Sequence, residues 1–331
     1  MEETKSGPAI LGDKGPRTWS SVWQLANTIL PFCGLVFLMY LSLSMSYWMT
    51  LGLGIVAGGF MIRIFIIQHD CGHGSFFNSR HWNNRIGRLC SLFTMIPYYY
   101  WRRMHALHHA TSGNLDRRGL GDVSTCTVDE YRQKTKFERL KYRAYRHPLV
   151  FLGLGPLALY LYTNRFVFDR ELTSKRDRRN VYITNLTIAV MLALFGWWIG
   201  FGKLALLAAP ILYVAAAAGI WLFYIQHQFD PNYWKRETEW DSTMSAVEGS
   251  SFFKLPKVLQ WFTGNIGYHH VHHLQEGVPN YRLQECHEEL ADLQNVHTLT
   301  FTSSLKTMFL SLWDEKRERL ISFREFARAG Q

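Results

Sequence analysis

The chain has 331 residues, enough for one large domain or two small ones, and its formal net charge is +10. Its mean hydropathy of −0.09 averages long apolar stretches with highly charged connectors, so the value does not describe a soluble protein. The first 20 residues lack the pattern of a cleavable signal peptide, and the five cysteines form no CxxC pair, which favours free thiols over a disulfide framework.

Four apolar stretches approach the roughly 20 residues that a helix needs to cross a bilayer. They cover residues 22–45, 47–67, 184–201 and 204–225. Two shorter apolar stretches, residues 89–100 and 149–162, each contain a proline and are expected to be interfacial or half-buried segments. The sequence therefore predicts an all-α membrane protein with four transmembrane helices in two hairpins, rather than a soluble protein with buried core helices.

The placement of charge predicts how these helices are oriented. The turn at residues 44–48 has no Lys or Arg, and the turn between the last two spans has only Lys203. Residues 68–181 carry 20 Lys or Arg against 9 Asp or Glu. Because positive residues collect on the cytoplasmic side of a membrane, both termini and a helical cap are expected in the cytoplasm.

This topology divides the chain into three parts. Residues 1–21 are expected to be a cytoplasmic tail, residues 22–290 the membrane domain with its cap, and residues 291–331 a C-terminal cytoplasmic segment. The basic stretch at residues 134–146 is of a kind that can bind nucleic acid. Beside membrane spans, anionic lipid head groups or an acidic redox partner fit it better, and no nucleic acid partner is expected.

Three short windows hold nine of the 14 histidines. They read His69-Asp-Cys-Gly-His73, His105-Ala-Leu-His108-His109 and His269-His270-Val-His272-His273. Spacings of three and four residues put imidazoles on one face of a helix. Since imidazole is the commonest metal ligand and one zinc-type site takes about four ligands, these clusters predict a dinuclear, histidine-rich metal centre at the membrane surface.

His270 breaks the helical spacing of its cluster, so it is expected beside the metal ligands and not among them. Ligand histidines need partners that orient their second ring nitrogen. The candidates for that role are Asp70, Asp122, Asn265 and Asp241. Surface or packing roles are expected for His81, His147, His287 and His297.

With these motifs the sequence resembles the membrane fatty acid desaturases, and most closely their bacterial acyl-lipid branch of the omega-6 (delta-12) or delta-5 type. The resemblance rests on the boxes HDCGH, HALHH and HHVHH, their order after paired spans, and the flanks HDCGHGSFFN, GNLDRRGLGDV, EGSSFFKLPKVLQWFTGNIGYHHVHHL and PNYRL. It covers roughly residues 20–290. It implies a ninth metal ligand, His227, directly after the fourth span.

The resemblance also implies a set of cofactors and partners. Imidazole suits zinc, copper, iron and nickel alike, but zinc has no redox chemistry. The family implies two iron ions (Fe2+), dioxygen, an external electron donor such as ferredoxin, a fatty acyl lipid as substrate, and the bacterial inner membrane with the site facing the cytoplasm. The implied ligands are His69, His73, His105, His108, His109, His227, His269, His272 and His273.

An acyl chain has no polar group near its reacting carbons, so an apolar tunnel must position it. Residues 98–101, with Arg102 and Arg103, are candidates for the tunnel rim and for head-group contacts; they also fit an interfacial aromatic belt with basic anchors. Residues 250–253 are further tunnel candidates. The double bond is expected in the middle or distal half of a C16–C18 chain.

Three alternatives remain open on the residues themselves. A hydroxylase or ketolase acting on a lipid, carotenoid or alkane could use the same histidine scaffold. A histidine-rich metal carrier would place ionisable residues within its spans, whereas these histidines lie just outside them. A zinc-dependent membrane hydrolase would show an HExxH motif, which the sequence lacks.

Overall fold

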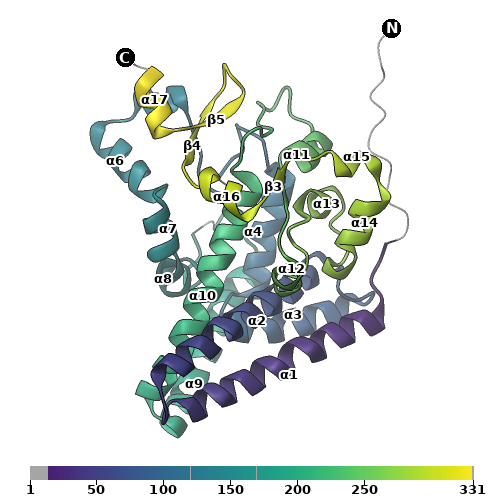
Figure 1. The fold of residues 1–331 in the computed structure, drawn as a ribbon, viewed down its shortest axis with the longest axis vertical. Helices are drawn as coiled ribbons and strands as arrows, with labels where there is room; N and C mark the ends of the chain where they lie inside the picture. Colours follow the sequence, from purple (N-terminus) through teal and green to yellow (C-terminus); the bar gives the residue numbers. More distant parts are fainter. Residues whose placement is uncertain (1–13, 120, 169, 330–331) are drawn as a thin grey trace.

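The computed structural model describes residues 14–329 except 120 and 169 (Figure 1). The fold is mostly helical, and four helices are long and apolar enough to cross a membrane. They are α1 (Thr18–Ser42), α2 (Tyr47–His73), α9 (Lys175–Ile199) and α10 (Phe201–His227). The predicted helical membrane fold with four candidate spans is thereby confirmed. Helix α9 begins nine residues before the predicted span, because a Ser174–Asp177 capping box starts it among charged residues.

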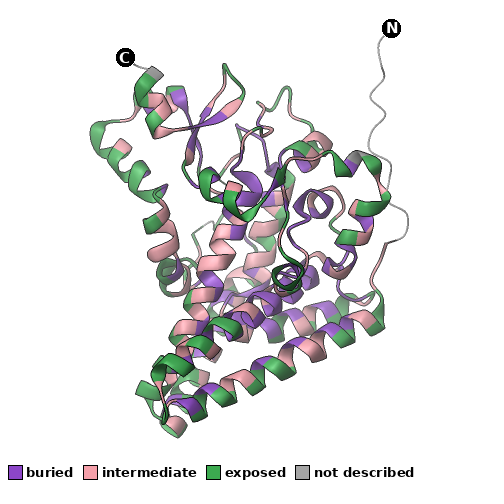
Figure 2. Cartoon of the chain, viewed as in Figure 1, coloured by how far each residue is buried: buried purple, intermediate pink, exposed green. Residues whose placement is uncertain are grey.

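The four long helices form two hairpins that pack through α2 and α10. Gly54 and Gly58 of α2 allow the close approach: a Cβ at Gly58 would lie 2.7 Å from Val214 Cγ1, and one at Gly54 would lie 2.9 Å from Pro210 Cβ. Helix α2 is the most buried of the four, while the outer faces of α1, α9 and α10 expose apolar side chains (Figure 2). Such faces suit lipid as their solvent.

A cap of short helices covers one end of the two hairpins (Figure 1). Before α9 it contains α3 (Arg80–Thr94), α4 (Tyr98–Thr111), α5 (Val128–Gln133) and α6 (Lys136–Tyr145). After α10 it contains α11 (Ser242–Glu248), α12 (Lys257–Phe262), α13 (His269–Leu274), the 3-10 turn η2 (Asn280–Arg282), α14 (Leu283–Glu289), α15 (Ala291–Gln294), α16 (Phe301–Thr307) and α17 (Phe323–Ala329). Capping boxes at Thr127, Thr135 and Thr300 start α5, α6 and α16.

Five short strands tie distant parts of the cap together, and the sequence predicts none of them. Strand β4 (Leu310–Asp314) pairs in parallel with β1 (Cys126–Thr127) and antiparallel with β5 (Arg319–Ser322). Strand β2 (Phe252–Phe253) pairs in parallel with β3 (Thr298–Leu299). Residues 298–322, which contain β3, β4 and β5, are therefore part of the cap.

Between α6 and α9 the chain returns toward the long helices. It forms α7 (Pro148–Gly153), α8 (Gly155–Ala158) and a single π-helical turn, η1 (Leu159–Thr163). This segment lies against α10: the Phe151 ring stacks on Tyr224 with centroids 4.7 Å apart, and the Tyr213 hydroxyl donates to the Leu152 carbonyl at 3.3 Å. The apolar stretch at residues 149–162 is thus built into the wall around α10.

Candidate metal centre

Four helices deliver histidines to one place where the long helices meet the cap. Helices α2 and α10 end in the cap and carry their histidines in their last turns. Helix α4 crosses between them, and α13 covers them. The histidines so placed are His69 and His73 on α2, His105, His108 and His109 on α4, His227 on α10, and His269, His272 and His273 on α13.

The nine histidines fall into two groups. The five-histidine group is His69, His73, His105, His109 and His272, and the four-histidine group is His108, His227, His269 and His273. Within each group, one ring nitrogen from every member lies within 4.8 Å of the others. The groups adjoin each other, since the His109 and His273 rings stack with centroids 4.1 Å apart.

The spacing of the ring nitrogens suits metal ions. The Nε2 atoms of neighbouring rings lie 2.9–3.1 Å apart in the pairs His69–His105, His105–His109, His109–His272, His108–His227 and His227–His269. Neighbouring ligands about 2.1 Å from one ion at right angles would be roughly 3.0 Å apart. The Nε2 atoms of His73 and His273 are buried without a hydrogen-bond partner among the described residues. The donor set therefore fits two metal ions.

Burial keeps the rings in the state that binds metals. It lowers the pKa of His108 to about 3 and those of His272 and His273 well below the usual value of imidazole. A neutral ring retains the lone pair that a metal accepts. These three rings would therefore stay neutral and able to bind a metal near neutral pH.

Two of the rings are oriented by groups on the non-metal side. The Asp70 carboxylate lies 3.1 Å from Nδ1 of His69 and also accepts from the backbone and side-chain amides of Asn280 at 2.7 Å each. The Gly249 carbonyl lies 3.1 Å from Nδ1 of His227. Such partners fix the tautomer and direction of a ligand histidine. Asp70 was among the candidates for this role, and Gly249 was not.

The other three candidates have different surroundings. Asp241 caps α11 by accepting from the Met244 amide at 2.8 Å, and Asn265 donates to the Asn280 carbonyl at 3.3 Å. Asp122 is near His227 but its hydrogen bond goes to the Val123 amide at 2.6 Å. Burial raises the pKa of Asp122, and the neighbouring His227 partly offsets this. None of the three accepts from a ring of the two groups.

Glu276 is a polar contact of the site that sequence reasoning missed. Its two carboxylate oxygens lie 3.0 Å from Nδ1 of His73 and 3.4 Å from Nδ1 of His109. The hydrogen bond to His73 lowers the pKa of Glu276, so the carboxylate stays ionised. Glu276 thus orients the His73 ring by a hydrogen bond, while its second oxygen only faces Nδ1 of His109 on another helix. Its position three residues after the third histidine cluster was the available hint.

We expect Glu276→Gln to weaken metal binding by about 10–100-fold, the usual effect of losing an outer hydrogen-bond partner of a metal ligand. The amide keeps the size of the side chain but loses the negative charge, so it binds the Nδ1–H of His73 more weakly and no longer faces His109 with a carboxylate. Metal content after dialysis against a graded series of chelator concentrations measures the loss. The matched control is Glu288→Gln, since Glu288 is an acid of α14 that contacts neither histidine group. If both variants retained the same amount of metal, the role of Glu276 would be refuted.

His270 lies outside both groups, although it is fully buried beside them. Its Nε2 atom is 3.0 Å from Nδ1 of His287, and both rings lie near Phe252. His287 therefore packs against the site's outer side and is not an isolated surface residue. His147 accepts from the Leu149 amide at the start of α7, and His297 stacks on Phe229, as expected for structural roles.

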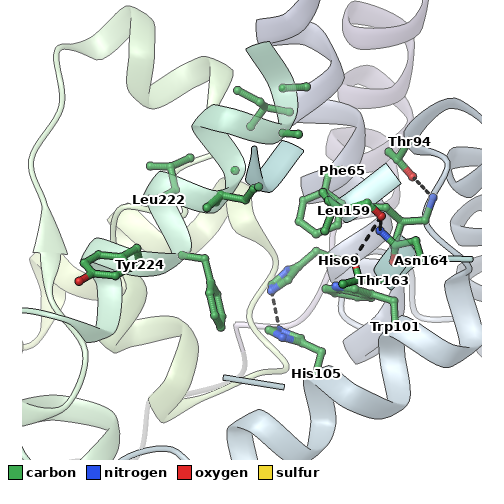
Figure 3. A pocket seen from close by; sticks show the side chains of 18 of the residues that line it. Phe65, His69, Thr94, Trp101, His105, Leu159, Thr163, Asn164, Leu222 and Tyr224 are labelled. Atoms are coloured by element: carbon green, nitrogen blue, oxygen red, sulfur yellow. Dashed lines mark hydrogen bonds between the residues drawn. The ribbon is translucent and has the colours of Figure 1, made fainter. Parts of the chain in front are cut away.

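An apolar cavity of about 520 Å³ reaches the histidines (Figure 3). His69, His105 and His269 lie on its wall, so it touches both groups. In Figure 3, Phe65, Trp101 and Leu159 lie on one side of the point where His69 and His105 meet, and the Trp101 ring stacks on His105. The remaining wall comes mainly from α2, α8, η1 and α10.

Most of the expected tunnel residues lie elsewhere. Trp101 lines the apolar cavity, but Tyr98 is buried with its hydroxyl on the Cys71 carbonyl at 2.7 Å, and residues 250–253 are not part of the wall. Arg102 and Arg103 instead line a second, polar recess of about 680 Å³ on the far side of His105. That recess also contains Arg80, Arg176 and Glu276.

Fold and site together define a class: membrane proteins that bring a long apolar molecule to a histidine-rich centre suited to metals. Comparison with known proteins then identifies the family. Residues 46–304 match the family model of fatty acid desaturases, which is most of the chain. The chain belongs to the fatty acid desaturase family, whose reaction places a double bond in a fatty acyl chain.

Individual relatives agree with this assignment. A protein of Bacillus subtilis named fatty acid desaturase is 47% identical over 93% of this chain and 87% of its own length. A Synechocystis protein named sn-1 acyl-lipid omega-3 desaturase (ferredoxin) is 29% identical over 71% of this chain and 66% of its own. A Picosynechococcus protein named sn-1 oleoyl-lipid 12-desaturase is 25% identical over 76% of this chain and 72% of its own.

Proposed function

We propose that this protein desaturates the acyl chain of a membrane lipid with two iron ions (Fe2+), dioxygen and two electrons from an external donor. The observation that supports it best is the apolar cavity whose wall includes histidines of both groups. Its volume of about 520 Å³ falls within the roughly 300–1,000 Å³ typical of pockets that enclose small ligands. An acyl chain in it would lie against the histidines without crossing water.

The nine histidines of the two groups are the proposed metal ligands. Their neutral rings and the carboxylates of Asp70 and Glu276 suit divalent ions, and the site would supply the redox chemistry for dioxygen if those ions are iron. Zinc would fit the imidazoles but has no redox chemistry. The reaction removes two hydrogens from adjacent methylenes, and dioxygen with two electrons and two protons takes them up as water.

The protein's own residues position the chain and keep water away. The methylenes offer no polar handle, so position comes from the shape of the wall. Phe65, Trp101 and Leu159 close the cavity on one side of the His69–His105 contact and exclude solvent there. We propose a C16–C18 chain with the new double bond in its middle or distal half, in line with the relatives named as 12- and omega-3 desaturases.

An external protein such as ferredoxin is the proposed electron donor, and a relative's name includes ferredoxin. The polar recess opens beside His73 and His105 and contains Arg80, Arg102, Arg103 and Arg176. The recess is also lined by the acids Glu171, Asp177 and Glu276, so the arginines outnumber the carboxylates by one. An acidic donor would find complementary charge there.

The proposed location is the bacterial inner membrane, with residues 1–21, the cap and residues 291–331 in the cytoplasm. We expect Met45→Cys, in the turn between α1 and α2, to react with a membrane-impermeant maleimide added to intact cells. Lys136→Cys in the cap should react only after the cells are opened. Both variants need Cys33, which is exposed, replaced by Ser. The reverse pattern of labelling would invert the topology.

Expression in a bacterial host that makes no polyunsaturated lipids tests the reaction itself. Gas chromatography with mass spectrometry of the fatty acids should show a loss of two hydrogens and locate the double bond. An added oxygen would instead indicate a hydroxylase on the same scaffold. Unchanged fatty acids together with an oxidised carotenoid or alkane would refute the lipid desaturase assignment.

A further inference from the structure

The segment Pro148–Thr163, which comprises α7, α8 and η1, is apolar and exposed although it belongs to none of the four candidate spans. Leu149 is 78% exposed and Leu161 71%. Leu154 and Leu157 are also exposed. A row of exposed leucines on a short segment needs an apolar environment outside the protein.

Contacts with α10 indicate how deep this segment lies in the membrane. A Cβ at Gly155 would lie 3.2 Å from Ile220 Cδ1. Ile220 precedes His227 by seven residues, which is about 10 Å along a helix. One leaflet contributes about 15 Å of the hydrocarbon thickness. With the His227 end of α10 at the membrane surface, Gly155 therefore lies within the cytoplasmic leaflet. Apolar stretches of about 10–14 residues are typical of such re-entrant segments.

The same segment forms one wall of the apolar cavity. Gly155, Ala158, Leu159 and Thr163 line it, and Gly219 of α10 lines the facing wall. Ala158 and Thr163 are exposed as well as part of the wall, and their neighbours Leu157 and Leu161 are exposed without lining the cavity, so the edge of the cavity lies at this segment. A Cβ at Gly219 would meet nothing within 4 Å, which leaves the opening unfilled. The π-helical turn at η1 is a conformation often found at functional sites.

The chain just before this segment is suited to the membrane surface. Helix α6 exposes Phe137 and Leu140, at 63% each, beside Lys136 and Lys141. Exposed aromatic and aliphatic side chains flanked by lysines are typical of helices that lie at an anionic lipid surface. The apolar face thus continues from α6 through η1 and joins the lipid-facing surfaces of the long helices.

We propose that the opening between η1 and α10 is a lateral doorway through which the acyl chain of a phospholipid in the cytoplasmic leaflet enters the cavity while its head group stays at the surface. This inference rests on the proposed function and names its substrate class, an intact membrane phospholipid. A water-soluble acyl thioester would enter from the cap instead, where Gly121 and Tyr145 are the exposed lining residues.

Photolabelling tests the doorway without requiring catalysis. The purified protein is placed in phosphatidylglycerol vesicles containing a phospholipid whose acyl chain carries a diazirine. Label on the α2 peptide with Met61 and Ile62, which line the cavity and are buried from lipid, reports a chain inside. We expect Ala158→Trp, at the doorway, to reduce that label at least tenfold. Leu157→Trp, at a position that is also exposed but lies outside the cavity wall, should leave it within twofold of the unsubstituted protein.

Desaturation of the vesicle lipid is measured in the same samples, with metal content as a check that each variant is folded. Thr163→Trp serves as a second doorway variant should Ala158→Trp lose metal. Interior label that persists in the doorway variants, or that is absent from the unsubstituted protein, would overturn the doorway. Interior label that depends on the doorway, in a protein that desaturates no lipid, would leave the doorway standing and refute the proposed function.

Discussion

His272→Ala, in the five-histidine group, and His108→Ala, in the four-histidine group, should each abolish desaturation. The loss should exceed the roughly 10–100-fold effect of removing a ligand's hydrogen-bond partner, because each substitution removes one of the nine proposed ligands. Each variant should also lower the metal content below two ions per chain. Elemental analysis of purified protein with a lipid assay measures both quantities. Membrane insertion should persist, since the four long helices do not depend on these side chains.

His270→Ala is the matched control for His272→Ala. Both rings are buried on the same short helix, but His270 contacts His287 and not either histidine group. We expect the control to retain metal and to lose much less activity. Complete loss of both metal and activity in His270→Ala would move this residue into the ligand set.

Arg146→Leu should be the most destabilising substitution in the cap. The Arg146 guanidinium is buried and donates to five acceptors: the carbonyls of Ser124 and Leu310, the Thr125 and Tyr224 hydroxyls, and the Gln228 side chain. Leucine would remove the donor from all five. The Leu310 carbonyl and the Gln228 side chain would keep one other donor each, the Tyr224 and Thr125 hydroxyls. Each buried acceptor left without a partner costs about 1–3 kcal/mol where water cannot replace the donor.

The thermal unfolding midpoint in detergent measures this effect. It should fall clearly for Arg146→Leu and hardly at all for Lys141→Leu, a control on the exposed side of α6 whose nearest interaction is with the Phe137 ring. An unchanged midpoint for Arg146→Leu would show that water satisfies the acceptors. Because the network connects α10 to the C-terminal strand β4, the variant should also become more sensitive to proteolysis near Leu310.

Local periodicity accounts for what the sequence could predict. Long apolar runs mark the four spans, and spacings of three and four residues place the ligand candidates of each histidine cluster on one helical face, so the convergence of eight rings could be predicted from local patterns. His227 stands alone in the sequence, and only the family resemblance pointed to it. Asp70 could be proposed because it is the neighbour of His69 in the chain. These features depend on residues within a few positions of one another.

Features that depend on contacts between distant parts of the chain could not be predicted from local patterns. Strands of two residues, such as β1 and β2, are too short to show an alternation of polar and apolar side chains. Glu276 reaches His73 across about two hundred residues, which no local pattern encodes. Tyr98 looked suitable for a tunnel rim, but it packs into the space left by Gly87, where a Cβ would be 2.3 Å from its ring. The cavity wall instead uses small residues whose positions only the packed helices define.

Both histidine groups take residues from α13, near residue 270 of the chain. A ribosome has therefore made more than four fifths of the protein before either group can be completed. All four long helices precede α13, so they are synthesised before the donor set is complete. If the two groups bind the proposed metal ions, both can be loaded only after α13 has joined helices that are already made.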